Sequence, residues 1–106
     1  GVFATVHDGP LVRARWSDLV CFAGLGPGEL TDAAGRKVLG ISQRRTRAGA
    51  RFQCAALGRW DPSRLVSLLA PLVEDDVAAI GELADAASGM AVDLSALLQG
   101  FLARLP

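Results

Sequence analysis

Two residues of this sequence, Lys37 and Cys21, are the main candidates for chemistry. Lys37 is the single lysine among 11 basic residues, and all the others are arginines. Arginine is a permanently charged fork, whereas the lysine amine is a compact charge that can contact one phosphate or carbonyl oxygen. Cys21 would be reactive as a thiolate, which Lys37 would favour if the fold brings the two together. A free cysteine is, however, more often a small buried hydrophobe.

Two further patterns suggest ligand binding but have plainer explanations. The glycines at 24, 26 and 28 could cradle a phosphate, but such loops open a helix, and Pro27 favours an ordinary loop. The arginines within residues 44–51 could bind nucleic acid, yet no aromatics interleave with them, which favours a solvated hairpin tip. Docking of an acidic protein partner is a third interpretation of the same arginines. Trp16 and Trp60 are expected to anchor the core.

The composition is that of one small domain. The chain has 106 residues, of which 51% are hydrophobic, enough for one core but not for two. Zero net charge argues against binding nucleic acid or an anionic membrane by bulk electrostatics, and no apolar run reaches the roughly 18 residues of a membrane helix. Two cysteines and one histidine argue against a disulfide framework or a zinc site. We therefore expect a cytoplasmic protein without metal ligands, nucleic-acid partners or membrane partners.

Periodicity divides the chain into a strand-rich part, residues 1–60, and a helical part, residues 61–106. The predicted elements are short strands within residues 1–7, 11–16, 19–23 and 29–32, a hairpin with arms 37–47 and 50–57, and helices within 61–72, 74–89 and 93–105. Asp61 is predicted to cap the first helix, with Pro62 at its first position, and Gly89 to end the second. The predicted fold class is α+β: an antiparallel or mixed sheet with a lysine-bearing hairpin, followed by two or three helices.

Residues 35–45 read Gly-Arg-Lys-Val-Leu-Gly-Ile-Ser-Gln-Arg-Arg. This stretch resembles the lipoate–protein ligase branch of the biotin/lipoate ligase family. That family carries Gly-(Arg/Lys)-Lys-hydrophobic-small-Gly on a strand, followed by (Ala/Ser)-(Gln/Tyr)-Arg-Arg and a return strand. The resemblance covers residues 21–65, and residues 61–72 are similar to the helix that follows in the family. It implies that both parts of the chain belong to one ligase-like catalytic domain.

The resemblance also implies roles for individual residues. Lys37 would contact the activated acyl carbonyl and the adenylate phosphate, where developing negative charge needs a preorganised cation. Gly35, Gly40, Ser42 and Gln43 would bind substrate and adenylate, with the backbone of Gly40 and Ser42 close to the acyl chain. Gly40 would leave room for that chain because it has no side chain. Lys37 would then face an open ligand cleft, and its truncation would cost little stability.

The activity that the resemblance implies is transfer of lipoate or octanoate to a lysine of an acceptor domain, through an acyl-adenylate made with ATP and Mg. The expected partner is a lipoyl-acceptor domain or an acyl carrier protein. The family's Arg-Arg-x-(Ser/Thr)-Gly-Gly-Gly segment, which holds the nucleotide and the acyl tail, is absent from this sequence. The chain therefore resembles the later part of a longer catalytic domain, and the missing N-terminal half is a further expected partner.

Two alternatives remain open. In the octanoyltransferases of the same family, a cysteine followed by phenylalanine carries the acyl group as a thioester without ATP, and Cys21-Phe22 is similar to that pair. Cys21 would then be the nucleophile and Lys37 would stabilise its thiolate. The second alternative belongs to another class of protein, a non-catalytic docking piece or an inactive fragment.

Overall fold

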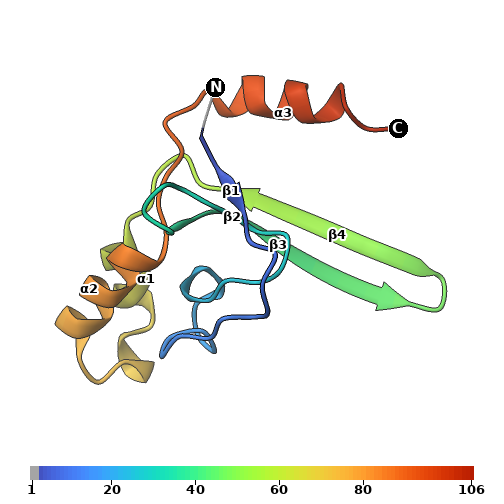
Figure 1. The fold of residues 1–106 in the computed structure, drawn as a ribbon. Coiled ribbons are helices and arrows are strands. Elements are labelled where there is room, and N and C mark those ends of the chain that lie inside the picture. Colours follow the sequence, from blue (N-terminus) through green and yellow to red (C-terminus); the bar gives the residue numbers. More distant parts are fainter. Residues whose placement is uncertain (1–2) are drawn as a thin grey trace.

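The computed structural model describes residues 3–106 and contains one four-stranded antiparallel sheet and three α-helices (Figure 1). The strands, in sheet order, are β1 (Thr5–Val6), β2 (Leu30–Thr31), β3 (Lys37–Thr46) and β4 (Gly49–Ala56). The helices are α1 (Pro62–Leu68), α2 (Asp76–Ala86) and α3 (Leu94–Leu102), with 3-10 turns η1 (Cys21–Ala23) and η2 (Ala70–Leu72). The predicted α+β fold class is confirmed, and the sheet is antiparallel throughout.

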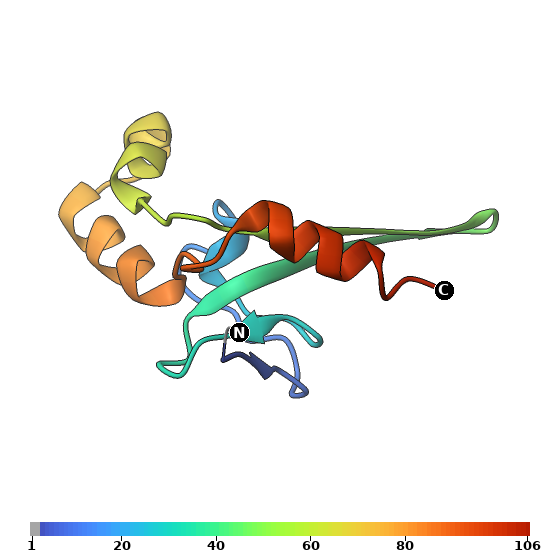
Figure 2. The ribbon, with the colours of Figure 1, turned by 90° about the horizontal axis from the view of Figure 1, so that it is seen from above.

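The predicted hairpin is confirmed as a long two-stranded ribbon formed by β3 and β4. Its register runs from Leu39 opposite Ala56 to Thr46 opposite Gly49, which leaves Arg47 and Ala48 in the turn. The ribbon projects away from the rest of the molecule (Figures 1 and 2) and is exposed on both faces from residue 42 to residue 55. The radius of gyration is accordingly 14.9 Å, against about 13 Å for a compact domain of roughly 100 residues.

The strands predicted within residues 11–16 and 19–23 are wrong. Residues 11–23 form an irregular segment, which ends in the turn η1. A single β-bridge pairs its Val12 with Leu25. Its buried apolar side chains, Trp16, Val20 and Ala23, are spaced four and three apart, which is the spacing of a helical face. Burial of these three side chains outweighs the β-propensity of the segment. The strand predicted within residues 1–7 shrinks to Thr5–Val6, and residues 1–2 lie outside the described residues.

The hydrophobic core lies between the irregular segment and the helical pair α1 and α2, not beneath the ribbon. Its buried members are Trp16, Val20, Ala23, Val66, Val73, Ala79 and Leu83. Both tryptophans anchor it as predicted: Trp16 Nε1 donates to the Glu82 carboxylate, and Trp60 Nε1 donates to the Leu83 carbonyl at 2.7 Å. The core thus joins residues from both the strand-rich and the helical part of the chain.

The helix starts follow the sequence signals, but one helix end does not. Asp61 caps α1 by accepting from the Ser63 amide, with Pro62 at the first helical position. α2 ends at Ala86 with extended backbone at Ala87, so the predicted cap at Gly89 is wrong. A Cβ at Gly89 would lie 2.8 Å from the Gly58 carbonyl oxygen. Glycine is required there because two backbone segments meet, not because a helix ends.

The helix predicted within residues 93–105 forms as α3, but none of its residues is buried. Its apolar stripe faces solvent, with Leu98, Phe101 and Leu102 each more than half exposed. Within residues 3–106, therefore, α3 lies against the remainder of the protein only loosely, and Figure 1 shows it set apart from the sheet. An apolar helix face of this kind normally packs on a partner surface.

The ribbon contains one pairing that opposes its own stability, which gives a first prediction. Arg44 lies directly opposite Arg51, and like charges in that position are destabilising. We expect Arg51→Thr to stabilise the chain by about 0.2–1 kcal/mol, with a gain that shrinks as salt screens the charges. Thermal melting at low and high salt measures this. Gln53→Thr, on the same face and strand, controls for strand propensity, and an equal gain from that variant would exclude charge repulsion.

Candidate functional site

The backbone of Lys37 is held on both sides at the beginning of β3. On one side it pairs with Thr31 of β2, and on the other it bridges to Ala87, where the Ser88 amide donates to the Lys37 carbonyl at 2.9 Å. The β2–β3 register shifts between Leu30 and Thr31, which marks a β-bulge. Bulges interrupt the strict alternation of side chains and re-aim them. Lys37 and its neighbour Val38 are consequently both buried.

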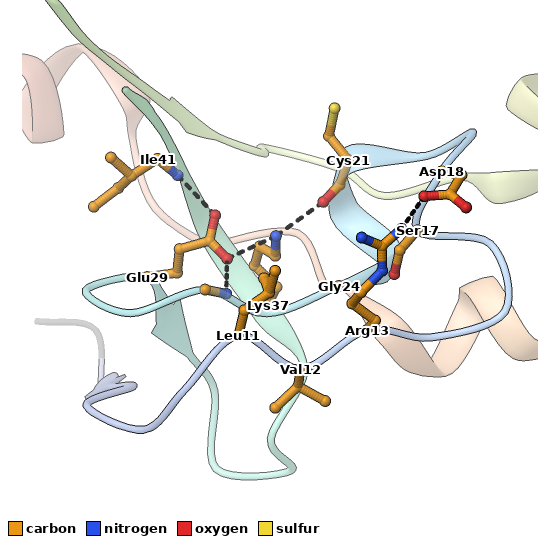
Figure 3. Close-up of a pocket in the computed structure, with 11 residues that line it drawn as sticks. Leu11, Val12, Arg13, Ser17, Asp18, Cys21, Gly24, Glu29, Lys37 and Ile41 are labelled. Atoms are coloured by element: carbon orange, nitrogen blue, oxygen red, sulfur yellow. Dashed lines mark hydrogen bonds and ion pairs between the residues drawn. The ribbon is translucent and has the colours of Figure 1, made fainter. Parts of the chain in front are cut away.

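The Lys37 ammonium is enclosed by protein groups (Figure 3). It lies 2.8 Å from the Glu29 carboxylate and donates to the Cys21 carbonyl oxygen at 3.0 Å, while the Phe22 ring centroid is 5.1 Å away. The Lys37 side chain is 4% exposed and that of Glu29 is 9% exposed. Because its charge forms a buried ion pair, we expect truncation of Lys37 to cost stability, which differs from the expectation drawn from the sequence.

Glu29 is the functional candidate that the sequence analysis missed. Its carboxylate also accepts from the amide of Gly26 at 2.7 Å and from that of Ile41 at 2.9 Å. It thereby connects the glycine loop, strand β3 and the lysine. A signal was present, since Glu29 is the one charged residue between positions 19 and 31, and a charge within an apolar stretch needs a partner when it is buried.

The environment of Glu29 favours its charged form. Burial alone raises the pKa of the carboxyl, but the hydrogen bond from Lys37, the amides of Gly26 and Ile41 and the charge of Lys37 outweigh burial, so the net pKa lies below the ordinary value of 4.5. Among residues 3–106, no buried side-chain nitrogen or oxygen is left without a hydrogen-bond partner. The cluster is therefore electrostatically complete within this chain.

The lowered pKa of Glu29 gives a prediction for pH dependence. A group whose pKa is depressed on folding contributes stability that is present above its unfolded value, here 4.5, and is lost as pH falls through the folded pKa. We expect the wild type to exceed Glu29→Gln in stability above pH 4.5, with the difference shrinking at lower pH. Urea unfolding of both proteins across this pH range measures the difference in their free energies of unfolding. The contributions of the other acidic residues cancel in this difference because both proteins contain them. A difference that does not change with pH would contradict the assignment.

A cleft of about 260 Å³ lies beside this cluster (Figure 3). Its walls come from residues 11–26 and from β3, with the Lys37 and Glu29 side chains contributing to one side. Arg13 and Asp18, which form an ion pair, contribute exposed charges to the lining. The cleft therefore combines the glycine loop, a buried cation and both polarities of charge in one place.

The structure brings Cys21 and Lys37 together, but not through the thiol. Both residues line the cleft, and the contact runs from the ammonium to the backbone carbonyl of Cys21. The exposed Cys21 sulfur points away from Lys37 (Figure 3). Cys21 also begins the turn η1 and does not lie on the strand that the sequence predicted. The Lys37 ammonium therefore does not contact the sulfur, as the nucleophile role would require.

The four other predicted site residues do not line this cleft. Gly35 lies in the exposed β2–β3 turn, where its φ of +79° explains the glycine. Gly40 is buried, and a Cβ there would lie 3.3 Å from the Phe22 ring and 3.4 Å from the Glu29 carboxylate, so protein atoms fill the space expected for an acyl chain. Ser42 and Gln43 lie on the ribbon, where Gln43 is exposed and Ser42 is opposite Gln53.

The resemblance implies ATP with magnesium, and the residues present fit these groups only in part. Lys37 suits a phosphate or acyl oxygen, but the cleft volume is below the roughly 300–1,000 Å³ of ordinary ligand pockets. In the described part of the chain, no three His, Cys, Asp or Glu side chains gather where they could hold a metal ion. These residues therefore fit part of an adenylate, and magnesium would be held there largely by the phosphates of the nucleotide.

Comparison with protein-family models, with curated proteins and with solved structures finds no match for this chain. Across residues 3–106, no helix has both the length and the apolar composition needed to cross a bilayer.

Proposed function

We propose that this chain is part of a lipoate–protein ligase-like catalytic domain, which transfers lipoate or octanoate to a lysine of an acceptor domain or acyl carrier protein. The observation that carries the proposal is the position of Lys37. The single lysine of the chain lies in the wall of a cleft, on a bulged strand, and Glu29 ties it to the glycine loop. This is the preorganised, poorly solvated cation that acyl transfer through an adenylate requires.

The exposed apolar surfaces support a further segment in the same domain. One face of the ribbon carries Ile41, Phe52 and Cys54, and Phe52 is 58% exposed. The stripe on α3 is exposed as well. Monomeric proteins rarely leave such apolar surface uncovered. A segment with the family's Gly-Gly-Gly motif would cover part of it, enlarge the cleft and hold the nucleotide.

In the proposed reaction, Lys37 exchanges partners. ATP, when bound, supplies the adenylyl group that activates the acyl carboxylate, with release of pyrophosphate, and the acceptor lysine amine then displaces AMP. Lys37 would leave the Cys21 carbonyl and donate to the acyl and phosphoryl oxygens, where negative charge develops. Glu29 would remain beside it and keep the ammonium directed at the cleft. The protein thus provides position and charge and does not itself form a covalent intermediate.

The second candidate, an ATP-independent transfer through Cys21, leads to a prediction. In the complete enzyme we expect Cys21→Ser to retain most of the acyl transfer, and transfer to require ATP, because the thiol does not contact Lys37. The measurement is octanoyl transfer to an acceptor domain with and without ATP, together with mass spectrometry of the enzyme. Cys54→Ser, the other free and exposed cysteine, is the matched control. An acyl thioester on Cys21 and loss of ATP-free transfer in Cys21→Ser alone would favour the transferase.

A non-catalytic docking piece is the remaining candidate, and the same assay separates it. If the complete protein binds an acceptor domain but transfers no acyl group from ATP plus octanoate or from an acyl carrier protein, the docking function stands.

We propose that this function is carried out in the cytoplasm. Both cysteines are free, and a reducing compartment such as the cytoplasm favours free cysteines.

A further inference from the structure

The zero net charge of the chain conceals a strong segregation of charge. Residues 33–60 hold seven of the 11 basic residues and none of the acidic ones, whereas residues 61–106 hold seven of the 11 acidic residues and two basic ones. The ribbon tip and the helical pair α1 and α2 lie at opposite ends of the molecule, whose longest extent is 46 Å (Figure 1). The acidic and basic ends do not neutralise each other's electric field over that distance, because salt screens charges beyond a Debye length of about 8 Å at physiological ionic strength.

The positive charges gather at the ribbon tip, and protein acids do not neutralise them. Four arginines lie there: Arg44, Arg45, Arg47 and Arg51. Within residues 3–106 none of the four forms an ion pair. Arg44 and Arg51 face each other across the strands, and a hollow of about 320 Å³ lies between them and the turn. A pair of opposed arginines beside a hollow is an arrangement that a carboxylate or phosphate would relieve.

The outer edge of β4 is open to a partner strand. β4 is the last strand of the sheet, so the backbone groups along that edge have no strand beside them among the described residues. It is exposed from Gly49 to Ala55 and contains no proline, no lysine and no bulge. Such features usually keep edge strands from pairing, and Arg51 is the one charged residue on β4. A polypeptide could extend the sheet here through main-chain hydrogen bonds.

We propose that the ribbon is a docking arm for an acidic polypeptide segment, which pairs with the β4 edge and places a carboxylate between Arg44 and Arg51. The open edge favours a polypeptide over nucleic acid, because only a polypeptide backbone can continue the ladder. The arginine face also lacks a stacking platform for bases: the one aromatic on the ribbon, Phe52, is on the opposite face. Under the proposed function, on which this last step rests, the acidic segment belongs to the acceptor domain.

The first experiment uses this chain and defined probes. The probe is a labelled peptide of alternating Glu and Thr with the length of β4, 8 residues, and its affinity is measured by fluorescence anisotropy. We expect binding that weakens with salt, that Arg44→Gln/Arg51→Gln reduces by about tenfold or more, and that Arg64→Gln/Arg104→Gln leaves unchanged. The control pair removes the same charge from two exposed residues of the helical part. Since all four side chains are exposed, both variants should fold, which thermal melting verifies.

Three probe changes decide the chemistry. A peptide of alternating Gln and Thr tests whether binding requires negative charge. A peptide of alternating Glu and Pro tests whether binding requires backbone pairing, because proline removes amide donors. Mixed-sequence duplex DNA and single-stranded RNA test whether the ribbon binds nucleic acid instead. Weak binding of all of these supports an acidic strand. Equal binding of the Glu–Pro peptide would overturn strand addition. Tighter binding of either nucleic acid, lost in Arg44→Gln/Arg51→Gln, would make the ribbon a nucleic-acid surface and overturn the proposal.

The link to the acceptor is tested separately in the complete enzyme. We expect Arg44→Gln/Arg51→Gln to raise the KM for the acceptor domain several-fold while the rate of acyl-adenylate formation stays unchanged. If the wild type forms no adenylate and transfers no acyl group, the proposed function fails and the peptide result stands. If adenylate forms and the acceptor KM is the same in both proteins, the acceptor does not dock on this arm, and that part of the proposal is overturned.

Discussion

Replacing Glu29 with Ala is expected to destabilise the chain by about 3–5 kcal/mol, because it leaves the Lys37 charge buried without its partner. The ammonium and the carboxylate are 2.8 Å apart, with side chains only 4% and 9% exposed. The same substitution deprives the amides of Gly26 and Ile41 of their acceptor. In a protein of this size, the loss corresponds to a fall in melting temperature of roughly 12–20 °C. Urea unfolding and thermal melting measure it.

A double-mutant cycle separates the ion pair from the rest of the site. Glu29→Gln keeps an oxygen for one of the amides, and Lys37→Met keeps much of the side-chain volume while removing the charge. Replacing both members of a buried pair often costs little, whereas replacing one leaves an uncompensated charge. We therefore expect the double variant to lose less stability than the sum of the two single variants. Strict additivity would mean that the two groups do not stabilise each other.

The second large effect concerns activity. In the complete enzyme, Lys37→Ala should lower acyl transfer roughly a hundred- to a thousand-fold, since one preorganised cation at the developing charge is typically worth about 2.7–4 kcal/mol. Lys37→Arg should restore little, because the ammonium position is bounded by Glu29, the Cys21 carbonyl and the Phe22 ring, and a planar fork is wider than that space. Single-turnover transfer to an acceptor domain measures both variants.

Lys37→Ala also removes a partner of Glu29, so lost activity must be separated from lost folding. Assays are run well below the melting temperature of each variant, and circular dichroism verifies that each is folded. Arg59→Ala removes a highly exposed cation that does not line the cleft, so it is the matched control and should keep full activity. Near-wild-type transfer by a folded Lys37→Ala would exclude the ligase function. Near-wild-type transfer by Lys37→Arg would reduce Lys37 to a generic positive charge.

Elements with local signals were predictable from the sequence. Alternating side chains on both sides of a short turn define the ribbon, and Asp61-Pro62 defines the beginning of α1. The segment that forms the cleft was not predictable in this way. Residues 11–23 have the composition of strands, but their conformation depends on burying Trp16 and Val20 against helices far along the chain.

The candidate site was predictable only in its members with unusual residue types. Lys37 and Cys21 were found because one is the single lysine and the other a potential nucleophile. The bond from the ammonium to a backbone carbonyl has no signature in the sequence, because any residue carries that carbonyl. The role of Glu29 depends on the bulge and on the fold of the glycine loop, which bring Gly26 and Ile41 to one carboxylate.

The bridge between Lys37 and Ala87 bears on the order in which the chain folds. It closes a loop that contains the whole ribbon and both core helices, and the Ser88 amide seals it at the Lys37 carbonyl. Contacts so distant in sequence form more slowly than a hairpin with a two-residue turn, because a long loop must be ordered first. The ribbon can thus exist before the cleft does. The groups that enclose the ammonium come from residues 21–29, so we expect Lys37 to stay hydrated, and the cost of burying its charge to be deferred, until that segment packs against β3.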